Sequence, residues 1–200
     1  MQNNPFQQTQ FIVSAVRPQQ YPPDNGAEVA IIGRSNSGKS STLNALCSRR
    51  KLAKTSKTPG RTQTINFFEV IKDKRLVDLP GYGYARAAES EQKKWSAFIT
   101  RYFAERESLR GVVIVMDARR PLMQNDWQVI HWLDDIAFHI LLNKTDKLKR
   151  SEAQRCLQKT SAALTDYRAS LQLFSAHSGQ GVAEARDQLS AWLGIGDASG

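Results

Sequence analysis

The sequence predicts an α/β fold: a mainly parallel six-stranded sheet with one antiparallel edge strand and helices on both faces. Strand-like and helix-like segments alternate along the 200 residues, a pattern that favours right-handed crossovers and a parallel sheet. Several strand segments are continuous apolar runs, as expected where helices cover both faces of a sheet. One pair of strand segments flanks the turn-like residues Lys72, Asp73 and Lys74, which predicts a hairpin and hence the antiparallel edge.

The first elements follow a polar, glutamine-rich extension at residues 1–27. Its apolar island at residues 11–16 predicts a short strand laid on the domain. An apolar strand is predicted at residues 28–32, and a glycine-bearing loop connects it to a helix at residues 39–47. Beyond a long basic loop, the two hairpin strands are predicted at residues 64–71 and 75–77.

The later elements begin with a helix at residues 90–106. It is predicted from apolar side chains that recur at i, i+3 and i+4: Trp95, Phe98, Ile99, Tyr102 and Phe103. The remaining strands are predicted at residues 112–116, 137–142 and 171–174, and the remaining helices at residues 126–133, 151–166 and 182–193. Asn125 and Ser151 are the expected N-caps of two of these helices, and Gly194 is the expected C-cap of the last. We expect one domain at residues 28–195 and a flexible tail at residues 196–200.

Composition restricts the class of protein. Hydrophobic residues make up 40% and charged residues 24%, the mix of a globular domain, and no apolar run reaches the roughly 18 residues that span a bilayer. The N-terminus lacks the features of a signal peptide, and Cys47 and Cys156 are expected to be free thiols, so we expect a cytoplasmic protein. The net charge of +9 indicates a polyanionic partner, with RNA the first choice. A generally solvated basic surface is the alternative.

A phosphate-binding loop is predicted at residues 33–40, which run Gly-Arg-Ser-Asn-Ser-Gly-Lys-Ser. The loop lies between a predicted strand and a predicted helix. Its glycines let backbone N–H groups approach phosphates, and the helix N-terminus adds the positive end of its dipole. We expect Lys39 to reach the β- and γ-phosphates and the Ser40 hydroxyl to coordinate Mg²⁺.

A second segment, Asp78 to Gly81, follows the strand at residues 75–77. Alone, this Asp-Leu-Pro-Gly sequence is a common turn. Downstream of a phosphate-binding loop, it places Asp78 on the Mg²⁺ side and offers the Gly81 N–H to the γ-phosphate.

A third segment predicts that the bound nucleotide carries guanine. It is Asn143-Lys144-Thr145-Asp146, which follows the strand at residues 137–142. These residues are also ordinary turn formers. A carboxylate at Asp146 accepts hydrogen bonds from N1–H and the exocyclic amine of guanine, and adenine offers neither donor. Sites built on such a pair reject the wrong ligand by about 10⁴. In a fourth segment, at residues 175–179, the backbone is expected to meet the guanine O6.

The four segments, in this order and each after a strand, resemble the translation-factor-like P-loop GTPases of the TrmE-Era-EngA-EngB-Septin-like superfamily. Residues 57–63, 65–68 and 78–85 resemble more narrowly the bacterial ribosome-biogenesis GTP-binding proteins of the EngB type. The resemblance spans residues 28–193. It implies one G domain, cytosolic location, Mg²⁺ dependence, and roles in maturation of the large ribosomal subunit and in cell division and septation.

The resemblance also implies the site residues. Thr62 is the switch threonine that binds Mg²⁺ in the GTP state, with Thr64 the competing choice. The expected catalytic residues are Lys39, Thr62, Gly81 and Asn36, and the expected Mg²⁺ ligands are Ser40, Thr62 and, through water, Asp78. The expected GTP-binding residues are Gly33, Arg34, Ser35, Asn36, Ser37, Gly38, Lys39, Ser40, Gly60, Arg61, Thr62, Gln63, Thr64, Asp78, Leu79, Pro80, Gly81, Asn143, Lys144, Thr145, Asp146, Ser175, Ala176 and His177.

Two positions bear on the rate of hydrolysis. Tyr82 follows the Asp-Leu-Pro-Gly segment, where many GTPases place a water-orienting glutamine, so we expect slow intrinsic hydrolysis that a partner or an ion stimulates. Asn36 stands where relatives hold K⁺ beside the phosphates, and a cation there would act as an arginine finger does. The alternative role of Asn36 is to stabilise the loop.

The sequence therefore predicts a monomeric switch that binds GTP and GDP, hydrolyses GTP, and acts in assembly of the 50S ribosomal subunit or its precursor through rRNA. No membrane or DNA partner is expected. The basic loop would present its cations to rRNA once GTP orders it: Arg49, Arg50, Lys51, Lys54, Lys57 and Arg61. The alternative is a GTP-gated regulator of a protein partner in cell division, without direct ribosome binding.

Overall fold

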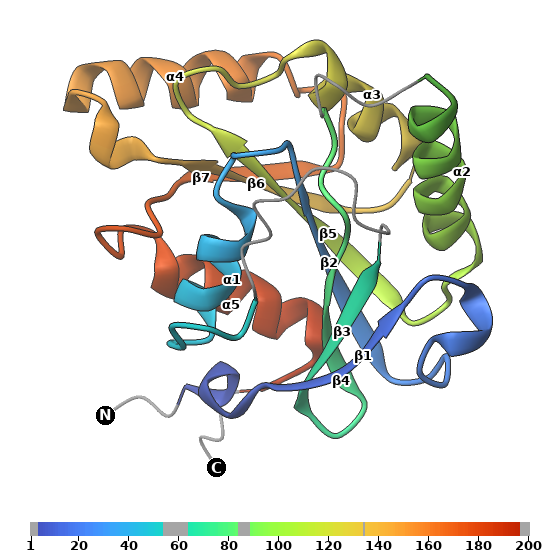
Figure 1. The fold of residues 1–200 in the computed structure, drawn as a ribbon. Helices are drawn as coiled ribbons and strands as arrows, with labels where there is room; N and C mark the ends of the chain where they lie inside the picture. The colour runs from blue at the N-terminus through green and yellow to red at the C-terminus, as the bar shows by residue number, and fades with distance from the viewer. Residues whose placement is uncertain (1–3, 54–63, 84–88, 134, 197–200) are drawn as a thin grey trace.

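The structure is a computed structural model that describes residues 4–53, 64–83, 89–133 and 135–196 (Figure 1). Seven strands form one sheet in the order β1-β3-β4-β2-β5-β6-β7. The strands are β1 (Gln10–Ala15), β2 (Ala27–Gly33), β3 (Ile65–Ile71), β4 (Lys74–Asp78), β5 (Leu109–Asp117), β6 (Phe138–Asn143) and β7 (Ala169–Leu173). Strand β3 runs antiparallel to both of its neighbours, and all other pairs are parallel.

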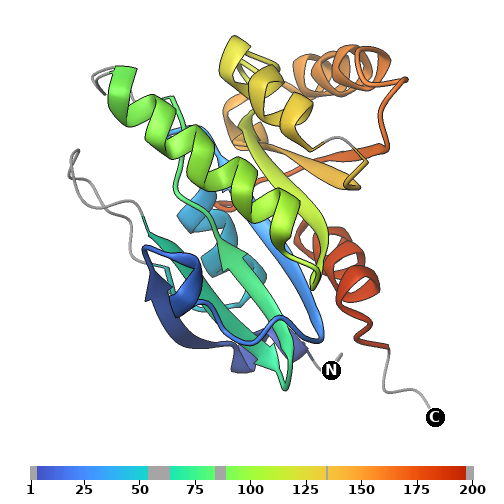
Figure 2. The same cartoon turned by 90° about the vertical axis from the view of Figure 1, so that its right-hand side faces the viewer.

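Helices cover both faces of this sheet, so the predicted α/β class is confirmed (Figures 1 and 2). The helices are α1 (Lys39–Leu46), α2 (Glu89–Glu105), α3 (Gln124–Trp132), α4 (Arg150–Ala162) and α5 (Val182–Leu193), with short 3-10 helices η1 (Pro5–Gln8), η2 (Pro18–Gln20) and η3 (Thr145–Lys147). Buried side chains of α2 and α3 and partly buried side chains of α4 share one core, and buried side chains of α1 and α5 share the other.

Strand β5 shows why these segments are strands. Val112, Ile114 and Met116 belong to the first core, whereas Val113 and Val115 belong to the second. Because successive side chains of a strand alternate between faces, an unbroken apolar run fills both cores at once.

The number of strands differs from the six predicted, because the N-terminal extension contributes β1 as a full edge strand. The antiparallel strand β3 consequently lies second from the edge, between β1 and β4. The short strand expected within the extension is confirmed. Phe11 and Ile12 of β1 are 54% and 41% exposed, since helices cover this edge only in part.

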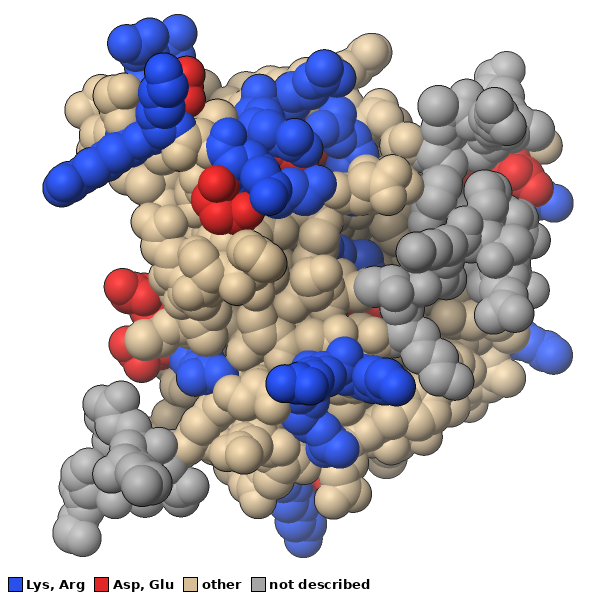
Figure 3. Space-filling view, turned by 60° about the vertical axis from the view of Figure 1, so that its left-hand side comes forward, with Lys and Arg blue, Asp and Glu red and all other residues tan. Residues whose placement is uncertain are grey.

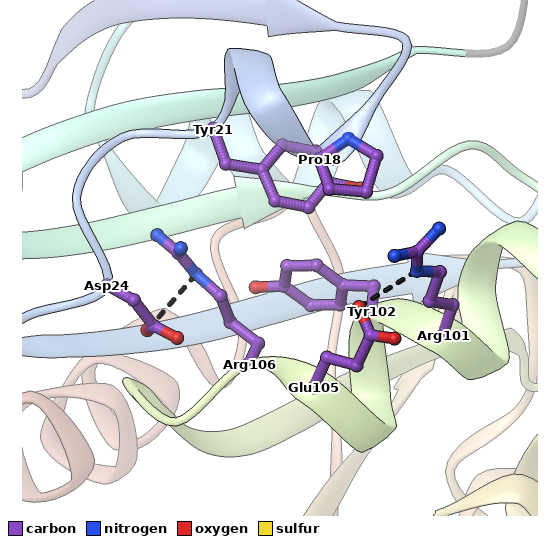
Figure 4. A pocket seen from close by; sticks show the side chains of 7 residues that line it. All are labelled: Pro18, Tyr21, Asp24, Arg101, Tyr102, Glu105 and Arg106. Atoms are coloured by element: carbon purple, nitrogen blue, oxygen red, sulfur yellow. Dashed lines mark hydrogen bonds and ion pairs between the residues drawn. The ribbon is translucent and has the colours of Figure 1, made fainter.

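The segment between η2 and β2 is held at the end of the sheet opposite the loop that follows β2. There the buried Glu28 accepts hydrogen bonds from Tyr102, Arg75 and Arg106. Tyr21 and Pro18 face the end of α2 across a cavity of about 170 Å³ (Figure 4). The charged groups at this cavity pair with one another, Asp24 with Arg106 and Arg101 with Glu105.

Within the described ranges, no helix has the length and apolar content needed to cross a bilayer.

Candidate nucleotide-binding site

The loop between β2 and α1 has a backbone that favours small residues. Asn36 and Gly38 have φ angles of +64° and +95°, in the left-handed region. A Cβ atom on Gly38 would lie 2.3 Å from Asn143 Nδ2, and one on Gly33 would lie 2.7 Å from the carbonyl oxygen of Val115. Gly33 is thus required by close packing, and Gly38 by both close packing and conformation.

Lys39, at the start of α1, forms an ion pair with Asp78 at the end of β4. The two side chains are 13% and 10% exposed. Asn66 Nδ2 donates a hydrogen bond to the other carboxylate oxygen of Asp78 at 3.2 Å. Two of the predicted phosphate- and metal-side residues therefore lie together.

The chemical type of the donor atoms near Lys39 fits Mg²⁺. Ser40 and Asp78 offer a hydroxyl and a carboxylate, oxygen donors of the kind Mg²⁺ prefers. The described part of the chain contains no group of three or more His, Cys, Asp or Glu that could hold a metal on its own. Such a donor set suits Mg²⁺ bound largely by substrate phosphates and water, rather than in an all-protein cage.

The segment after Asp78 runs beside the phosphate-binding loop. The Ser35 N–H donates to the carbonyl oxygen of Tyr82 at 2.7 Å, and the Tyr82 N–H donates to Gly33 at 3.3 Å. Pro80 accepts a hydrogen bond from the Trp95 indole at 3.2 Å. Gly81 is therefore held at the edge of the loop, and its contact with the γ-phosphate stays a prediction.

The Tyr82 side chain is only 3% exposed, and its hydroxyl donates to Asp126 Oδ1 of α3 at 2.7 Å. Burial, followed by the Asp126 carboxylate, raises the pKa of Tyr82 well above its usual value, so the phenol is protonated and donates at neutral pH. Burial also raises the pKa of Asp126.

Asn143 connects three of the predicted segments. Its Nδ2 donates to the Ser37 carbonyl oxygen at 2.8 Å, and its Oδ1 accepts from the Ala176 N–H at 3.2 Å. Thr145 Oγ1 donates to the Phe174 carbonyl oxygen at 2.9 Å. The loops after β2, β6 and β7 are thereby fixed relative to one another.

Lys144 has a positive φ of +68°, and its Nζ contacts the Asn36 carbonyl oxygen and, at 3.0 Å, Asp117 Oδ2. Arg119 also donates to Asp117, at 2.6 and 2.9 Å. Burial favours a raised pKa for Asp117, but the hydrogen bonds from Arg119 and Lys144 outweigh burial and hold the pKa below its usual range. Asp117 therefore stays ionised and anchors Lys144 across the phosphate-binding loop.

The residue Asp146 is exposed as a whole, but its side chain is only 15% exposed, and Ser175 Oγ donates to its Oδ1 at 2.7 Å. This hydrogen bond is the main cause that lowers the pKa of Asp146, with Lys147 adding to it at 3.3 Å. An ionised carboxylate is an acceptor only, which is what the N1–H and amine of guanine require. His177, next to Ala176, is exposed.

Several residues predicted to bind the nucleotide or rRNA lie in a segment that the structure does not describe. Gly60, Arg61, Thr62 and Gln63 lie outside the described residues, as do Lys54 and Lys57. Thr64 is described, and its hydroxyl donates to Asn66 Oδ1 at 3.2 Å. The choice between Thr62 and Thr64 as the Mg²⁺ ligand therefore stays a prediction.

Sequence reasoning missed three residues that hold the predicted ones in place: Asn66, Asp117 and Asp126. The position of Asp117 was a usable signal, because it ends a buried strand at the carboxyl edge of the sheet, as Asp78 does. Asn66 lies in the segment 65–68 that carries the family resemblance, but that resemblance assigned it no role in the site. Asp126 lies within a helix, where no motif distinguishes it.

Comparisons with known proteins agree with this geometry. A family model described as "50S ribosome-binding GTPase" matches residues 28–144. A "Probable GTP-binding protein EngB" from Coxiella burnetii (strain RSA 493 / Nine Mile phase I) is 48% identical over 192 residues, covering 94% of this chain and 94% of the relative. Its namesake from Escherichia coli O6:K15:H31 (strain 536 / UPEC) is 47% identical over 197 residues, covering 96% of this chain and 94% of the relative.

Solved structures support the fold. The "Crystal structure of a probable GTP-binding protein engB" matches with a TM-score of 0.67 at 22% identity, covering 85% of this chain and 100% of that one. A structure of Era in complex with MgGDPNP and a segment of 16S ribosomal RNA matches with a TM-score of 0.64 at 18% identity, covering 83% of this chain and 56% of that one. From its identity with the curated relatives and its match to the family model, the chain belongs to the EngB family of GTP-binding proteins and is a P-loop GTPase.

Proposed function

We propose that this GTPase is a switch in assembly of the 50S ribosomal subunit, that it acts in the cytoplasm, and that its loss impairs cell division and septation. The observation that carries the proposal is the position of its basic side chains. Exposed cations follow two of the strands whose carboxyl ends build the nucleotide site: Arg119 and Arg120 after β5, and Lys147, Lys149 and Arg150 after β6. Arg49, Arg50 and Lys51 are also exposed but follow α1 at the opposite end of the sheet, where Arg49 donates to the Thr9 carbonyl oxygen. A polyanion bound to the cations after β5 and β6 would contact the part of the domain that the nucleotide contacts.

The surface in Figure 3 supports this proposal, because lysines and arginines gather there in separate groups with few acidic side chains among them. Two of these cations also serve the site, Arg119 through Asp117 and Lys147 through Asp146. The family description, "50S ribosome-binding GTPase", names the same partner. rRNA phosphates are the partner that the net charge of +9 favours.

Within the site, we propose that Lys39 contacts the β- and γ-phosphates, that Gly81 donates its N–H to the γ-phosphate, and that Asp146 binds guanine. Bound Mg²⁺ would neutralise phosphate charge, held by Ser40 and Thr62 and, through water, by Asp78. On nucleotide binding, the Lys39 ammonium would leave the Asp78 carboxylate and contact the phosphates instead. K⁺ beside Asn36 is a further candidate cation.

The burial of Tyr82 supports slow intrinsic hydrolysis. Its hydroxyl is engaged by Asp126, so this side chain does not serve to orient an attacking water. This position lacks a group that orients the attacking water, and the ribosome or an ion would supply that function.

The test is co-sedimentation with purified 50S particles in a non-hydrolysable GTP analogue, in GDP and without nucleotide, at several salt concentrations. We expect the strongest binding with the GTP analogue and a steep loss with salt. The double variant Lys149→Gln, Arg150→Gln is expected to reduce the slope of log affinity against log salt by about 1.5–2, because each lost phosphate contact removes a little under one unit.

The matched control is Lys72→Gln, Arg110→Gln, which removes the same charge at the opposite end of the sheet and is expected to leave the slope near wild type. Binding that ignores the nucleotide would contradict the proposal. Absence of 50S binding would favour the alternative, a GTP-gated regulator of a protein partner.

A further inference from the structure

A row of polar side chains crosses three strands and ends at Asp78. Ser14 of β1 lies opposite Asn66 of β3, and Asn66 lies opposite Asp78 of β4. Directly paired residues on neighbouring strands present their side chains on the same face of the sheet. Ser14 Oγ donates to Asn66 Oδ1 at 2.6 Å, and Asn66 Nδ2 donates to Asp78 Oδ2 at 3.2 Å.

The chemistry of the row fixes the direction of the Asn66 amide. An ionised carboxylate only accepts hydrogen bonds, so the nitrogen of the amide must face Asp78. The amide oxygen then accepts from two hydroxyls, those of Ser14 and Thr64. Each of these hydrogen bonds polarises the amide and strengthens the next one in the chain.

The two oxygens of Asp78 have different partners. Oδ1 pairs with Lys39, which the proposed function assigns to the phosphates, whereas Oδ2 is held by the neutral amide of Asn66. A neutral donor adds no charge that would compete with a metal ion. It can hold the carboxylate in one orientation while Lys39 exchanges one partner for another.

We propose that Asn66 is a positioning residue for the Mg²⁺-dependent step, acting through Asp78, and that Ser14 links the N-terminal strand to this step. The inference rests on the proposed role of Asp78 at Mg²⁺. Through Ser14, the N-terminal extension thereby helps to position Asp78, in addition to forming the edge strand of the sheet.

The test measures the Mg²⁺ concentration that gives half-maximal binding of a fluorescent non-hydrolysable GTP analogue. The variants are Asn66→Ala and the near-isosteric, apolar Asn66→Leu. We expect both to raise that concentration about tenfold, because a hydrogen bond to a charged group is stronger than one between neutral groups. Ser14→Ala is expected to raise it about two- to threefold, and Gln10→Ala on the same strand to leave it unchanged.

Two further readouts separate positioning from a general structural effect. GDP affinity in EDTA should stay within about twofold of wild type for every variant, because the metal is then absent. Adding Asn66→Ala to Asp78→Ala should cause no further change, since a residue that acts through Asp78 has nothing left to position.

Additive effects in the double variant, or an unchanged Mg²⁺ dependence in both Asn66 variants, would overturn the inference while leaving the proposed function intact. A wild-type protein whose GTP-analogue binding ignores Mg²⁺ would instead remove the proposed role of Asp78 itself.

Discussion

The hydroxyl of Tyr82 donates a 2.7 Å hydrogen bond to the carboxylate of Asp126, and both side chains are almost fully buried. This contact joins the segment after β4 to helix α3. The Tyr82 side chain, directly after the Asp-Leu-Pro-Gly segment, therefore belongs to the protein core.

Replacement of Tyr82 by Phe should therefore affect stability more than chemistry. We expect Tyr82→Phe to lower the free energy of unfolding by about 1–3 kcal/mol, because Asp126 Oδ1 loses its donor. Intrinsic GTP hydrolysis should change by less than about threefold, or roughly 0.7 kcal/mol in the barrier. Urea unfolding and single-turnover hydrolysis measure the two effects.

Tyr102→Phe is the matched control, because its phenol donates to the buried Glu28 at 3.0 Å, at the other end of the sheet. A tenfold slower hydrolysis in Tyr82→Phe but not in Tyr102→Phe would show that the Tyr82 phenol takes part in the reaction.

Gly38 is the position where packing against Asn143 is tightest. Gly38→Ala should lower GDP affinity at least about tenfold, or 1.4 kcal/mol, because the added methyl would displace the Asn143 amide. Gly194, at the end of α5, is the control, since its φ is +60° but an added Cβ would meet only Lys74 Nζ, at 3.6 Å. Gly194→Ala should cost only about 1–2 kcal/mol of stability. Equal GDP affinities in the two variants would contradict the assigned role of Asn143.

The Ser175–Asp146 hydrogen bond predicts a pH dependence. Since it lowers the pKa of Asp146, the ionised carboxylate persists to lower pH, and guanine binding is lost as the pH falls through that pKa. Ser175→Ala should raise the pKa of Asp146 and move the loss of GDP affinity to higher pH. Titrating GDP affinity from about pH 7 down to about pH 3 tests this, because the range includes the ordinary Asp pKa of about 3.9.

Ser178→Ala removes a hydroxyl from the same loop and serves as the control. Superimposable pH profiles for the wild type and Ser175→Ala would rule out this role of Ser175.

Asn36 offers a clean test of the two roles considered for it. Asn36→Gly removes the side-chain amide while keeping the φ of +64° accessible. If Asn36 holds K⁺, the wild type should hydrolyse GTP at least about tenfold faster in KCl than in NaCl, a small part of what an arginine finger supplies. Asn36→Gly should then abolish this difference. Equal wild-type rates in the two salts would leave only the loop-stabilising role.

The segments proposed to bind the nucleotide could be identified from the sequence because each lies within a few consecutive residues at the end of a strand. Of the residues that support these segments, Asp117 carried a usable signal at the end of a buried strand. The roles of Asn66 and Asp126 could not be predicted, because they reach the segments from elsewhere in the chain through pairing and packing. The register that aligns Ser14, Asn66 and Asp78 depends on β1 joining the sheet, which hydrophobic pattern alone left as a short added strand.

The first residues of two helices were also predicted wrongly from the sequence. Asn125 and Ser151 were the expected N-caps, but α3 begins at Gln124 and α4 at Arg150. Asp126 and Glu152 accept hydrogen bonds from the N–H groups of Met123 and Lys149, each at 2.8 Å. An acidic residue in the first turn therefore outweighed the local cap preference. Gly194, with its φ of +60°, ends α5 as predicted.

The most direct test of a guanine site built on Asp146 is a competition titration of GTP and xanthosine triphosphate against a fluorescent nucleotide, with wild type and Asp146→Asn. Xanthine carries a carbonyl where guanine carries its amine, so an Asn amide can donate where the carboxylate had to accept. Asp146→Asn should weaken GTP at least about 100-fold, or 2.7 kcal/mol, and should bind xanthosine triphosphate more tightly than GTP. A variant that still prefers GTP, with near wild-type affinity, would contradict the assignment of Asp146 to the base.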